Sequence, residues 1–141
     1  MSGITIGELK IDDSAEFSKT ISEADIYLFA GVTGDFNPAH INEEYAKGTF
    51  FKGRIAHGML FAGFISAVIG CQLPGPGSIY IKQDLKFRAP GRIGDTVTAK
   101  VTVGEIIEEK NRVILKTTCT NQEGVLLLDG HATISPPKKN S

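Results

Sequence analysis

The sequence predicts an α+β domain in which one long apolar helix is followed by an antiparallel sheet. Residues 55–73 contain no Asp, Glu, Lys or Arg, whereas residues 96–103 and 112–119 alternate apolar with polar side chains. Such alternation is typical of half-buried strands. The chain has 141 residues, of which 41% are hydrophobic and 22% charged. We therefore expect a single domain, 1–141, with one core.

The uncharged segment is nearly long enough to cross a membrane, but its composition favours the interior of a protein. His57, Ser66 and Gln72 interrupt it, together with three glycines. A helix that is surrounded by protein is expected to be apolar on all sides. The sequence therefore predicts a central core helix from His57 to about Ile69, buried on every face.

Turn residues divide the rest of the chain into further elements. Ser22 opens a helical pattern with acidic residues one and three positions on, and Gly34 is placed to end that helix. The other expected segments are strands in 4–11 or 16–21, in 78–90 and in 124–135, and a frayed tail at 136–141. Together they predict an antiparallel meander of about five strands, and such a sheet curved around one helix is the hot dog arrangement. Periodicity alone does not separate it from other α+β topologies.

Charge and cysteine content argue against several classes of function. A formal charge of -1 gives the chain no electrostatic reason to bind nucleic acid or an anionic membrane. Cys71 and Cys119 lie far apart without CxxC spacing, so both are interpreted as buried thiols. The histidines, His40, His57 and His131, are scattered, and we expect no metal site. No signal peptide is recognised, which predicts a cytoplasmic location.

The segment TGDFNPAH, residues 33–40, places a carboxylate and an imidazole close together in the chain. Asp-x-Asn-Pro is common turn chemistry, so a purely structural turn is one interpretation. Asp35 and His40 are, however, the side-chain types best suited to proton transfer near neutral pH, and a turn containing proline can bring them together. We interpret them as a candidate catalytic pair, and we expect Asn37 to position Asp35 and the loop.

The residues around this segment resemble a known family. Residues 29–46, FAGVTGDFNPAHINEEYA, are similar to the signature of the (R)-specific enoyl-CoA hydratases, the hydratase 2 or MaoC-like group of hot dog proteins. The matching positions are Gly34, Asp35, Asn37, Pro38, His40 and Ala46, and the departures are Phe29 for Tyr, Thr33 for Ser and Asn42 for Asp. The resemblance continues through 54–70 and 85–101, and therefore covers most of the chain.

The resemblance implies reversible hydration of trans-2-enoyl-CoA to (R)-3-hydroxyacyl-CoA, with Asp35 and His40 handling the catalytic water. A backbone N–H at a helix N-terminus suits the enolate-like charge on the thioester oxygen, and family resemblance gives Gly58 this role. Alternatively, Gly58 could only allow tight packing of the helix. Ser66, on the Gly58 face of the helix, could support the pair or bond to its own helix. His57 is expected to cap or pack at the helix start.

The expected partner is an acyl-CoA substrate, and no cofactor is expected because the substrate itself carries coenzyme A. Lys86, Arg88 and Arg92 could meet its phosphates or form a solvated edge. The resemblance also implies a homodimer with a continuous sheet. His131 belongs to a segment with apolar neighbours and is interpreted as a structural residue. Two other functions remain open. A hot dog acyl-CoA thioesterase needs a similar carboxylate and helix terminus, and a non-catalytic acyl-CoA-binding module would keep the pocket without needing the catalytic pair.

Overall fold

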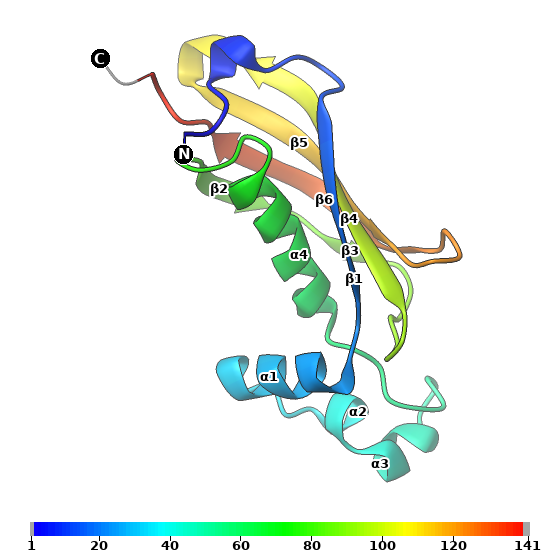
Figure 1. Cartoon of the computed structure of the whole chain (residues 1–141). Coiled ribbons are helices and arrows are strands. Elements are labelled where there is room, and N and C mark those ends of the chain that lie inside the picture. Colours follow the sequence, from blue (N-terminus) through cyan, green and yellow to red (C-terminus); the bar gives the residue numbers. More distant parts are fainter. Residues whose placement is uncertain (1, 140–141) are drawn as a thin grey trace.

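The computed structural model describes residues 2–139, which form one antiparallel sheet with a long helix packed against it (Figure 1). The strands are β1 (Ser14–Thr20), β2 (Ile79–Gln83), β3 (Lys86–Phe87), β4 (Thr96–Ile107), β5 (Arg112–Thr120) and β6 (Leu126–Ser135). The α-helices are α1 (Glu23–Thr33), α2 (Pro38–Ile41), α3 (Glu43–Lys47) and α4 (Gly58–Cys71), and two 3-10 turns are η1 (Ile6–Glu8) and η2 (Glu108–Lys110).

The sheet has the strand order β1-β4-β5-β6-β2, and the short β3 also pairs with β6. Strands β4, β5 and β6 are consecutive neighbours, which confirms the predicted meander for this part. The sheet curves around α4, which contacts β1, β4 and β5 (Figure 1). The α+β class and the hot dog arrangement are therefore confirmed.

The core lies between α4 and the inner face of the sheet. The predicted alternation in β4 and β5 is confirmed, since every second side chain is buried there. From α4, Phe61, Ile65 and Val68 pack into the same cluster. The inward residues of the two strands are Val97, Ala99, Val101, Val103, Val113, Leu115, Thr117 and Cys119. Burial also raises the pKa of the Cys119 thiol to about 12.

The predicted strands differ from the structure at two places. Of the two N-terminal alternatives, 16–21 is correct, because β1 covers most of it and 4–11 contains η1. The single strand predicted at 78–90 is wrong, since it is divided into β2 and β3. A register shift interrupts β2, and at Gly130 a Cβ would lie only 1.9 Å from the carbonyl oxygen of Asp84. This close approach of two backbones marks the break between β2 and β3.

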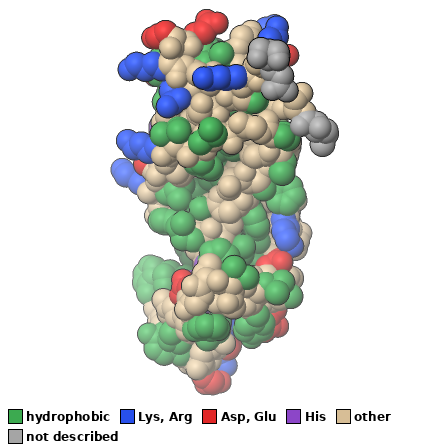
Figure 2. All heavy atoms as spheres, turned by 90° about the vertical axis from the view of Figure 1, so that its left-hand side faces the viewer, with side chains coloured by type: hydrophobic (Ala, Val, Ile, Leu, Met, Phe, Trp, Pro, Cys, Tyr) green, Lys and Arg blue, Asp and Glu red, His purple; other side chains and the backbone are tan. Residues whose placement is uncertain are grey.

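The prediction that the central helix is buried on every face is wrong. The sheet covers only one side of α4, and the opposite side is exposed, with Met59 56% accessible. Cys71 lies at the exposed end of the helix, so its predicted burial is also wrong. Figure 2 looks onto the side of the molecule where β2 and α4 lie and shows hydrophobic side chains at its surface. The other exposed residues of α4 are Gly63, Ser66, Ala67 and Gly70.

The C-terminal segment is packed further than expected. Pro136 is buried, and its carbonyl accepts a hydrogen bond of 2.9 Å from Asn111 Nδ2, so the predicted frayed tail is wrong at this residue. Lys138 and Lys139 are exposed, and positions 140–141 of that prediction lie outside the described residues. None of the helices within residues 2–139 has the length and apolar character to cross a membrane.

The helices α1, α2 and α3 lie beside the N-terminal end of α4 (Figure 1). Helix α1 begins at the predicted capping box, in which Ser22 Oγ accepts from the Asp25 N–H and the Asp25 carboxylate accepts from the Ser22 N–H. It ends at Gly34, whose φ of 82° is the left-handed conformation that glycine adopts readily. The chain therefore turns at Gly34 and brings residue 35 toward the start of α4.

Candidate active site

Asp35 lies in the short loop between α1 and α2. Its N–H donates to Thr33 Oγ1 (3.1 Å), and its Oδ1 accepts from the Asn37 N–H (3.2 Å). The Asn37 side chain instead caps α2 by accepting from the Ala39 N–H (3.0 Å). Asn37 thus holds the Asp35 carboxylate through its backbone and the loop end through its side chain. The Asp35 side chain is exposed in the single chain.

His40 is buried in α2 and has a fixed orientation. Its Nδ1–H donates to the carbonyl of Ile55 at 2.8 Å. A carbonyl oxygen only accepts, so Nδ1 carries the proton and Nε2 is the nitrogen that remains able to exchange one. Ile55 belongs to the segment that leads into α4, and this bond therefore fixes the imidazole relative to the helix start.

His57 is the N-cap residue of α4 and is only 2% exposed. Its Nε2–H donates to the backbone carbonyl of Asp35 at 3.0 Å. The His57 ring packs on the His40 ring with centroids 3.9 Å apart, and on Phe29 with centroids 4.8 Å apart. Its Nδ1 is buried and has no hydrogen-bond partner among the described residues. His57 is therefore part of the site, although its sequence position suggested only a cap or packing residue.

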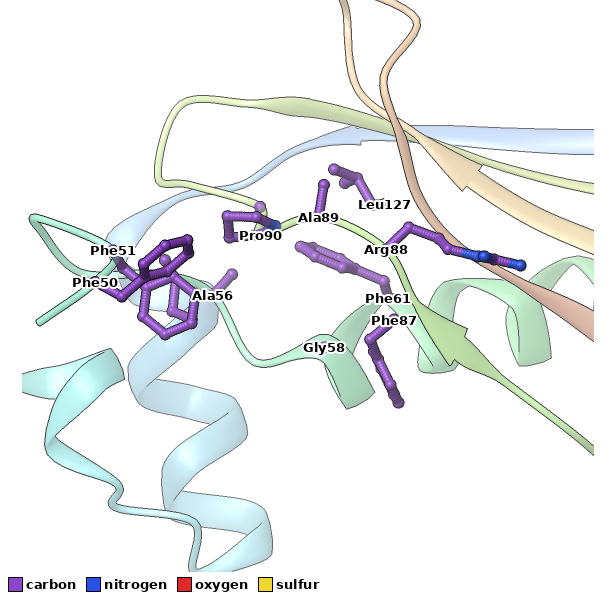
Figure 3. Close-up of a pocket in the computed structure, with 12 residues that line it drawn as sticks. Phe50, Phe51, Ala56, Gly58, Phe61, Phe87, Arg88, Ala89, Pro90 and Leu127 are labelled. Atoms are coloured by element: carbon purple, nitrogen blue, oxygen red, sulfur yellow. The ribbon is translucent and has the colours of Figure 1, made fainter.

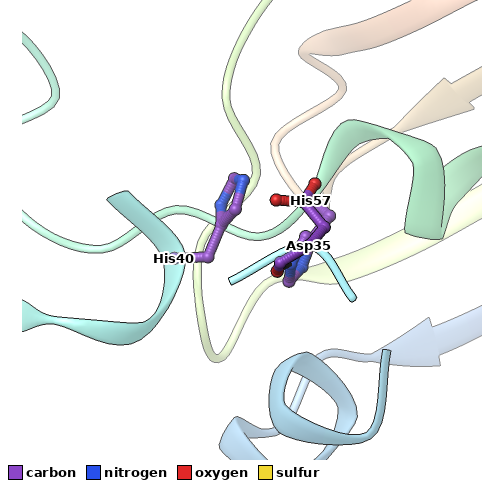
Figure 4. A group of neighbouring side chains, drawn as sticks. All are labelled: Asp35, His40 and His57. Carbon is purple, nitrogen blue, oxygen red and sulfur yellow. Dashed lines mark hydrogen bonds between the residues drawn. The ribbon is translucent and has the colours of Figure 1, made fainter. Parts of the chain in front are cut away.

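Asp35, His40 and His57 come together at the start of α4 (Figure 4), and one ligand-type atom from each lies within 4.8 Å of the others. The expectation that the histidines are scattered is wrong for His40 and His57, because the fold stacks their rings. Each ring donates one N–H to a backbone carbonyl, which explains their orientation without a metal ion. A metal-free site stays a prediction.

Gly58 is the first residue of α4, where a backbone N–H has no acceptor within the helix. A Cβ at this position would lie 2.5 Å from the ring of Phe87. The close approach of Phe87 favours a glycine here on packing grounds, and the role of the Gly58 N–H as oxyanion donor stays a prediction. Beside Gly58 lies a cavity of about 320 Å³ with mainly apolar walls, in which Phe61 and Phe87 lie near Gly58 while Phe50 and Phe51 lie at the other end (Figure 3).

Ser66 lies on the exposed face of α4, in a groove of about 420 Å³ shared with Phe29, Met59 and Tyr80. No hydrogen bond of its hydroxyl, either to the catalytic pair or to its own helix, is found within residues 2–139. Phe29 lines this groove and also packs on His57, so the groove adjoins the site. The polar residues Tyr80 and Gln83 of the groove were not predicted, because nothing in a strand pattern distinguishes them. Burial raises the pKa of Tyr80 to about 12.

The three cations considered for coenzyme A phosphates have different surroundings. Arg88 forms an ion pair of 2.9 Å with Asp129, and Arg92 donates to the carbonyl of Phe51 at 2.6 Å. Lys86 is exposed and has no ion pair among the described residues. Of the three, Lys86 is the most available for a phosphate. His131 is exposed on β6 and lies outside the three-residue cluster.

The family of the chain follows from comparison with known proteins. A model of the MaoC like domain matches residues 8–124. The chain belongs to this family. It is 59% identical to the (R)-specific enoyl-CoA hydratase of Rhodospirillum rubrum, over 94% of this chain and 91% of that protein. It is 49% identical to the 3-hydroxybutyryl-CoA dehydratase of Methylorubrum extorquens, over 94% of this chain and 83% of that protein.

A solved structure of an R-hydratase has the same fold. The R-hydratase PhaJ1 from Pseudomonas aeruginosa, in its unliganded form, superposes with a TM-score of 0.92 at 44% identity. The superposition covers 98% of this chain and 88% of that chain. The predicted family is therefore confirmed, and the chain is an enzyme of the hydratase and dehydratase type.

The first testable prediction concerns the pH dependence of stability. Desolvation by burial lowers the pKa of His57 below its usual value of 6.5. Between 6.5 and that lowered value the unfolded chain binds a proton that the folded chain does not, so the free energy of unfolding should fall as the pH drops through this range. Replacing His57 by Phe should remove this contribution to the pH dependence of the free energy of unfolding.

Urea unfolding of the wild type and His57→Phe from about pH 7.5 to about pH 5 measures the difference in slope. Glu23, Asp25 and Asp129 also have lowered pKa values, but their usual values are 4.5 or lower, so they act below this range. If the free energy of unfolding changes with pH in the same way for both proteins, the prediction is contradicted.

Proposed function

We propose that the chain catalyses the reversible hydration of trans-2-enoyl-CoA to (R)-3-hydroxyacyl-CoA. The observation that carries the proposal is the meeting of the Asp35 carboxylate and the His40 imidazole beside the N-terminus of α4. The identity of 59% to an (R)-specific enoyl-CoA hydratase supports the substrate class. The 49% identical dehydratase supports the reverse direction of the same reaction.

Asp35 and His40 handle the water that is added. One of them takes a proton from the water as its oxygen bonds to C3, and the C2=C3 electron pair moves toward the thioester to give an enolate-like state. The other gives a proton to C2, which completes the addition of water, and transfer of one proton within the pair restores both groups. His40 takes part through Nε2, since its Nδ1–H is bonded to Ile55.

Gly58 supplies the third requirement, stabilisation of the negative charge on the thioester oxygen. Its N–H lies at the positive end of the α4 dipole, and donors of this kind act most strongly on charge that develops in the transition state. Gly58 and Phe61 line the apolar cavity, whereas Met59 and Ala62 line the groove on the exposed face. These two hollows flank the first turn of α4 and are the candidate positions for the acyl chain and the pantetheine arm.

The functional unit in this proposal is a homodimer. The free edge of the sheet at β2 carries exposed apolar residues, with Ile79 59% and Ile81 49% accessible, and the neighbouring face of α4 is also exposed. An exposed apolar edge strand is a typical site of pairing with a second chain. Pairing of two β2 edges would extend the sheet across both chains. Sedimentation equilibrium should give twice 15.1 kDa, and a monomer at assay concentration would contradict this part.

The remaining expectations belong to the same proposal. The reaction needs no cofactor other than the coenzyme A of its substrate, because the proton-handling groups and the oxyanion donor are all supplied by the chain. A cytoplasmic location is supported by the two free cysteines, Cys71 and Cys119, which are common in reducing compartments. Recovery of the protein in the soluble cytoplasmic fraction of its cells would test the location.

The function is tested by incubating the protein with a short trans-2-enoyl-CoA. Loss of the conjugated enoyl absorbance without release of free thiol is the expected result, and oxidation of the product by an (R)-specific 3-hydroxyacyl-CoA dehydrogenase should go to completion. Thiol release would indicate a thioesterase, and tight binding without turnover would indicate a binding module. Oxidation by only the (S)-specific dehydrogenase would contradict the stereochemistry.

The Gly58 prediction separates packing from oxyanion stabilisation. The Cβ of Gly58→Ala would lie 2.5 Å from the Phe87 ring. In the proposal it also keeps the thioester oxygen away from the Gly58 N–H, which alanine retains, so turnover should fall by about 100-fold, as when one oxyanion donor is lost. Adding Phe87→Ala removes the ring that the Cβ meets, and turnover should stay low because the thioester is still blocked.

Recovery of wild-type turnover in the Gly58→Ala/Phe87→Ala double variant would assign Gly58 to packing alone. Gly31→Ala is the control, since a Cβ at Gly31 in α1 meets nothing within 4 Å. It should leave turnover unchanged.

A further inference from the structure

His57 connects the parts of the site that come from different segments of the chain. It directly precedes Gly58, so its backbone is continuous with the proposed oxyanion donor. Its side chain reaches back across the site, and its Nε2–H donates to the Asp35 carbonyl at 3.0 Å. The start of α4 and the loop that carries Asp35 are therefore joined by this one side chain.

Among the described residues, the bond from His57 is the one that ties Asp35 to the start of α4. Among the hydrogen bonds of the described residues, the others made by Asp35 are local in sequence, to Thr33 at the end of α1 and to Asn37 at the start of α2. Local bonds of this kind shape the loop but do not set its distance from α4. Helix α2, which follows the loop, is bonded to Ile55, and the His57 bond adds the direct link that holds the exposed Asp35 at the residue before Gly58.

The ring of His57 also fixes the second proton-handling group. It packs on two other rings, with His40 at a centroid distance of 3.9 Å and an interplanar angle of 30°, and Phe29 at 4.8 Å. His40 is thus held by its bond to Ile55 on one nitrogen and by the His57 ring on its face. A shift of the His57 ring would move both His40 and Asp35.

His57 carries out this task as a neutral imidazole. The residue is only 2% exposed, and burial lowers its pKa. The bond to Asp35 places the proton on Nε2, so the unpartnered Nδ1 has a lone pair and no charge. Because the ring is neutral, it can pack on His40 without electrostatic repulsion when His40 is protonated.

We infer that His57 is a positioning residue of the hydration reaction, which holds Asp35, His40 and the Gly58 N–H in one arrangement through its ring and its Nε2–H. This inference rests on the proposed function. It assigns His57 no proton transfer of its own, because one ring nitrogen is bonded to a backbone carbonyl and the other is buried. Its effect on turnover is expected to pass through Asp35 and His40.

Two substitutions separate the two contacts of His57. His57→Phe keeps a ring that can pack on Phe29 and His40 but loses the donor to Asp35, whereas His57→Gln keeps a donor and loses the ring. Displacement of reacting groups by about 1 Å can cost on the order of 100-fold in rate. We expect His57→Phe to lower kcat by about 30-fold to 100-fold with KM within about 3-fold, and His57→Gln to recover part of that loss.

The deciding measurement places His57→Phe in protein that already carries Asp35→Asn. If His57 acts by holding the pair, its replacement should cost less than about 3-fold in that background, because groups that act as a unit have non-additive effects. His131→Phe, the same change at an exposed histidine, is the control and should be neutral. Thermal unfolding of each variant confirms that folded protein is compared.

Three results would overturn the inference. The first is a folded His57→Phe enzyme with wild-type kcat. The second is a fall in kcat from His57→Phe that is equally large with and without Asp35→Asn. The third is a change in KM with no change in kcat. If His57→Phe does not fold, His57→Gln is measured in the same two backgrounds and the same criteria apply. If Asp35→Asn alone proves fully active, the proposed function fails. This outcome can be told apart from failure of the inference, because His57→Phe is also compared directly with the wild type.

Discussion

The site depends on where the first turn of α4 stands. The sheet packs on one face of this helix and fixes its axis, and the unpaired N–H groups at its start form a site for negative charge. Both histidines are oriented by backbone carbonyls around this point, His40 by Ile55 and His57 by Asp35. The proposed proton-handling groups from one segment and the proposed oxyanion donor from another are thereby brought to the same place.

The same geometry explains why one face of α4 is exposed in the single chain. A sheet curved around a helix covers only the side it faces, so within residues 2–139 no second layer covers the residues opposite to Phe61 and Ile65. Small residues such as Gly63 and Ala67 occur there, next to the apolar β2 edge. In the proposed dimer this surface is buried, and the groove that contains Ser66 and adjoins Phe29 becomes a closed part of the site.

Local patterns predicted most of the fold because their causes are local. The alternation in β4 and β5 reports burial on one face of a sheet, and the Ser22 capping box and Gly34 fix the ends of α1 by contacts within four residues. The division of 78–90 into β2 and β3 was not predictable, because it depends on Gly130 approaching Asp84 from a distant strand. The exposure of Cys71 was missed for a related reason: an apolar sequence does not say which face of a helix is covered.

The candidate site was predicted in part. TGDFNPAH pointed to Asp35 and His40 because a carboxylate and an imidazole close together in sequence are chemically informative. His57 was undervalued, since its bond to the Asp35 carbonyl and its stacking on His40 are long-range contacts. The signal that could have raised its weight is its place directly before Gly58 at the start of the apolar helix.

The central claim is that Asp35 and His40 act together on one water, and a double-variant cycle of kcat for enoyl-CoA hydration tests it most directly. Asp35→Asn keeps the shape and the turn and removes the proton capacity, so it should lower kcat by roughly 100-fold or more, and His40→Gln should behave similarly. The double variant should lose far less than the product of the two losses, with little change in thermal stability. Asp12→Asn and His131→Gln, at exposed positions, are the controls. A fully active Asp35→Asn enzyme, or losses that multiply in the double variant, would contradict the account.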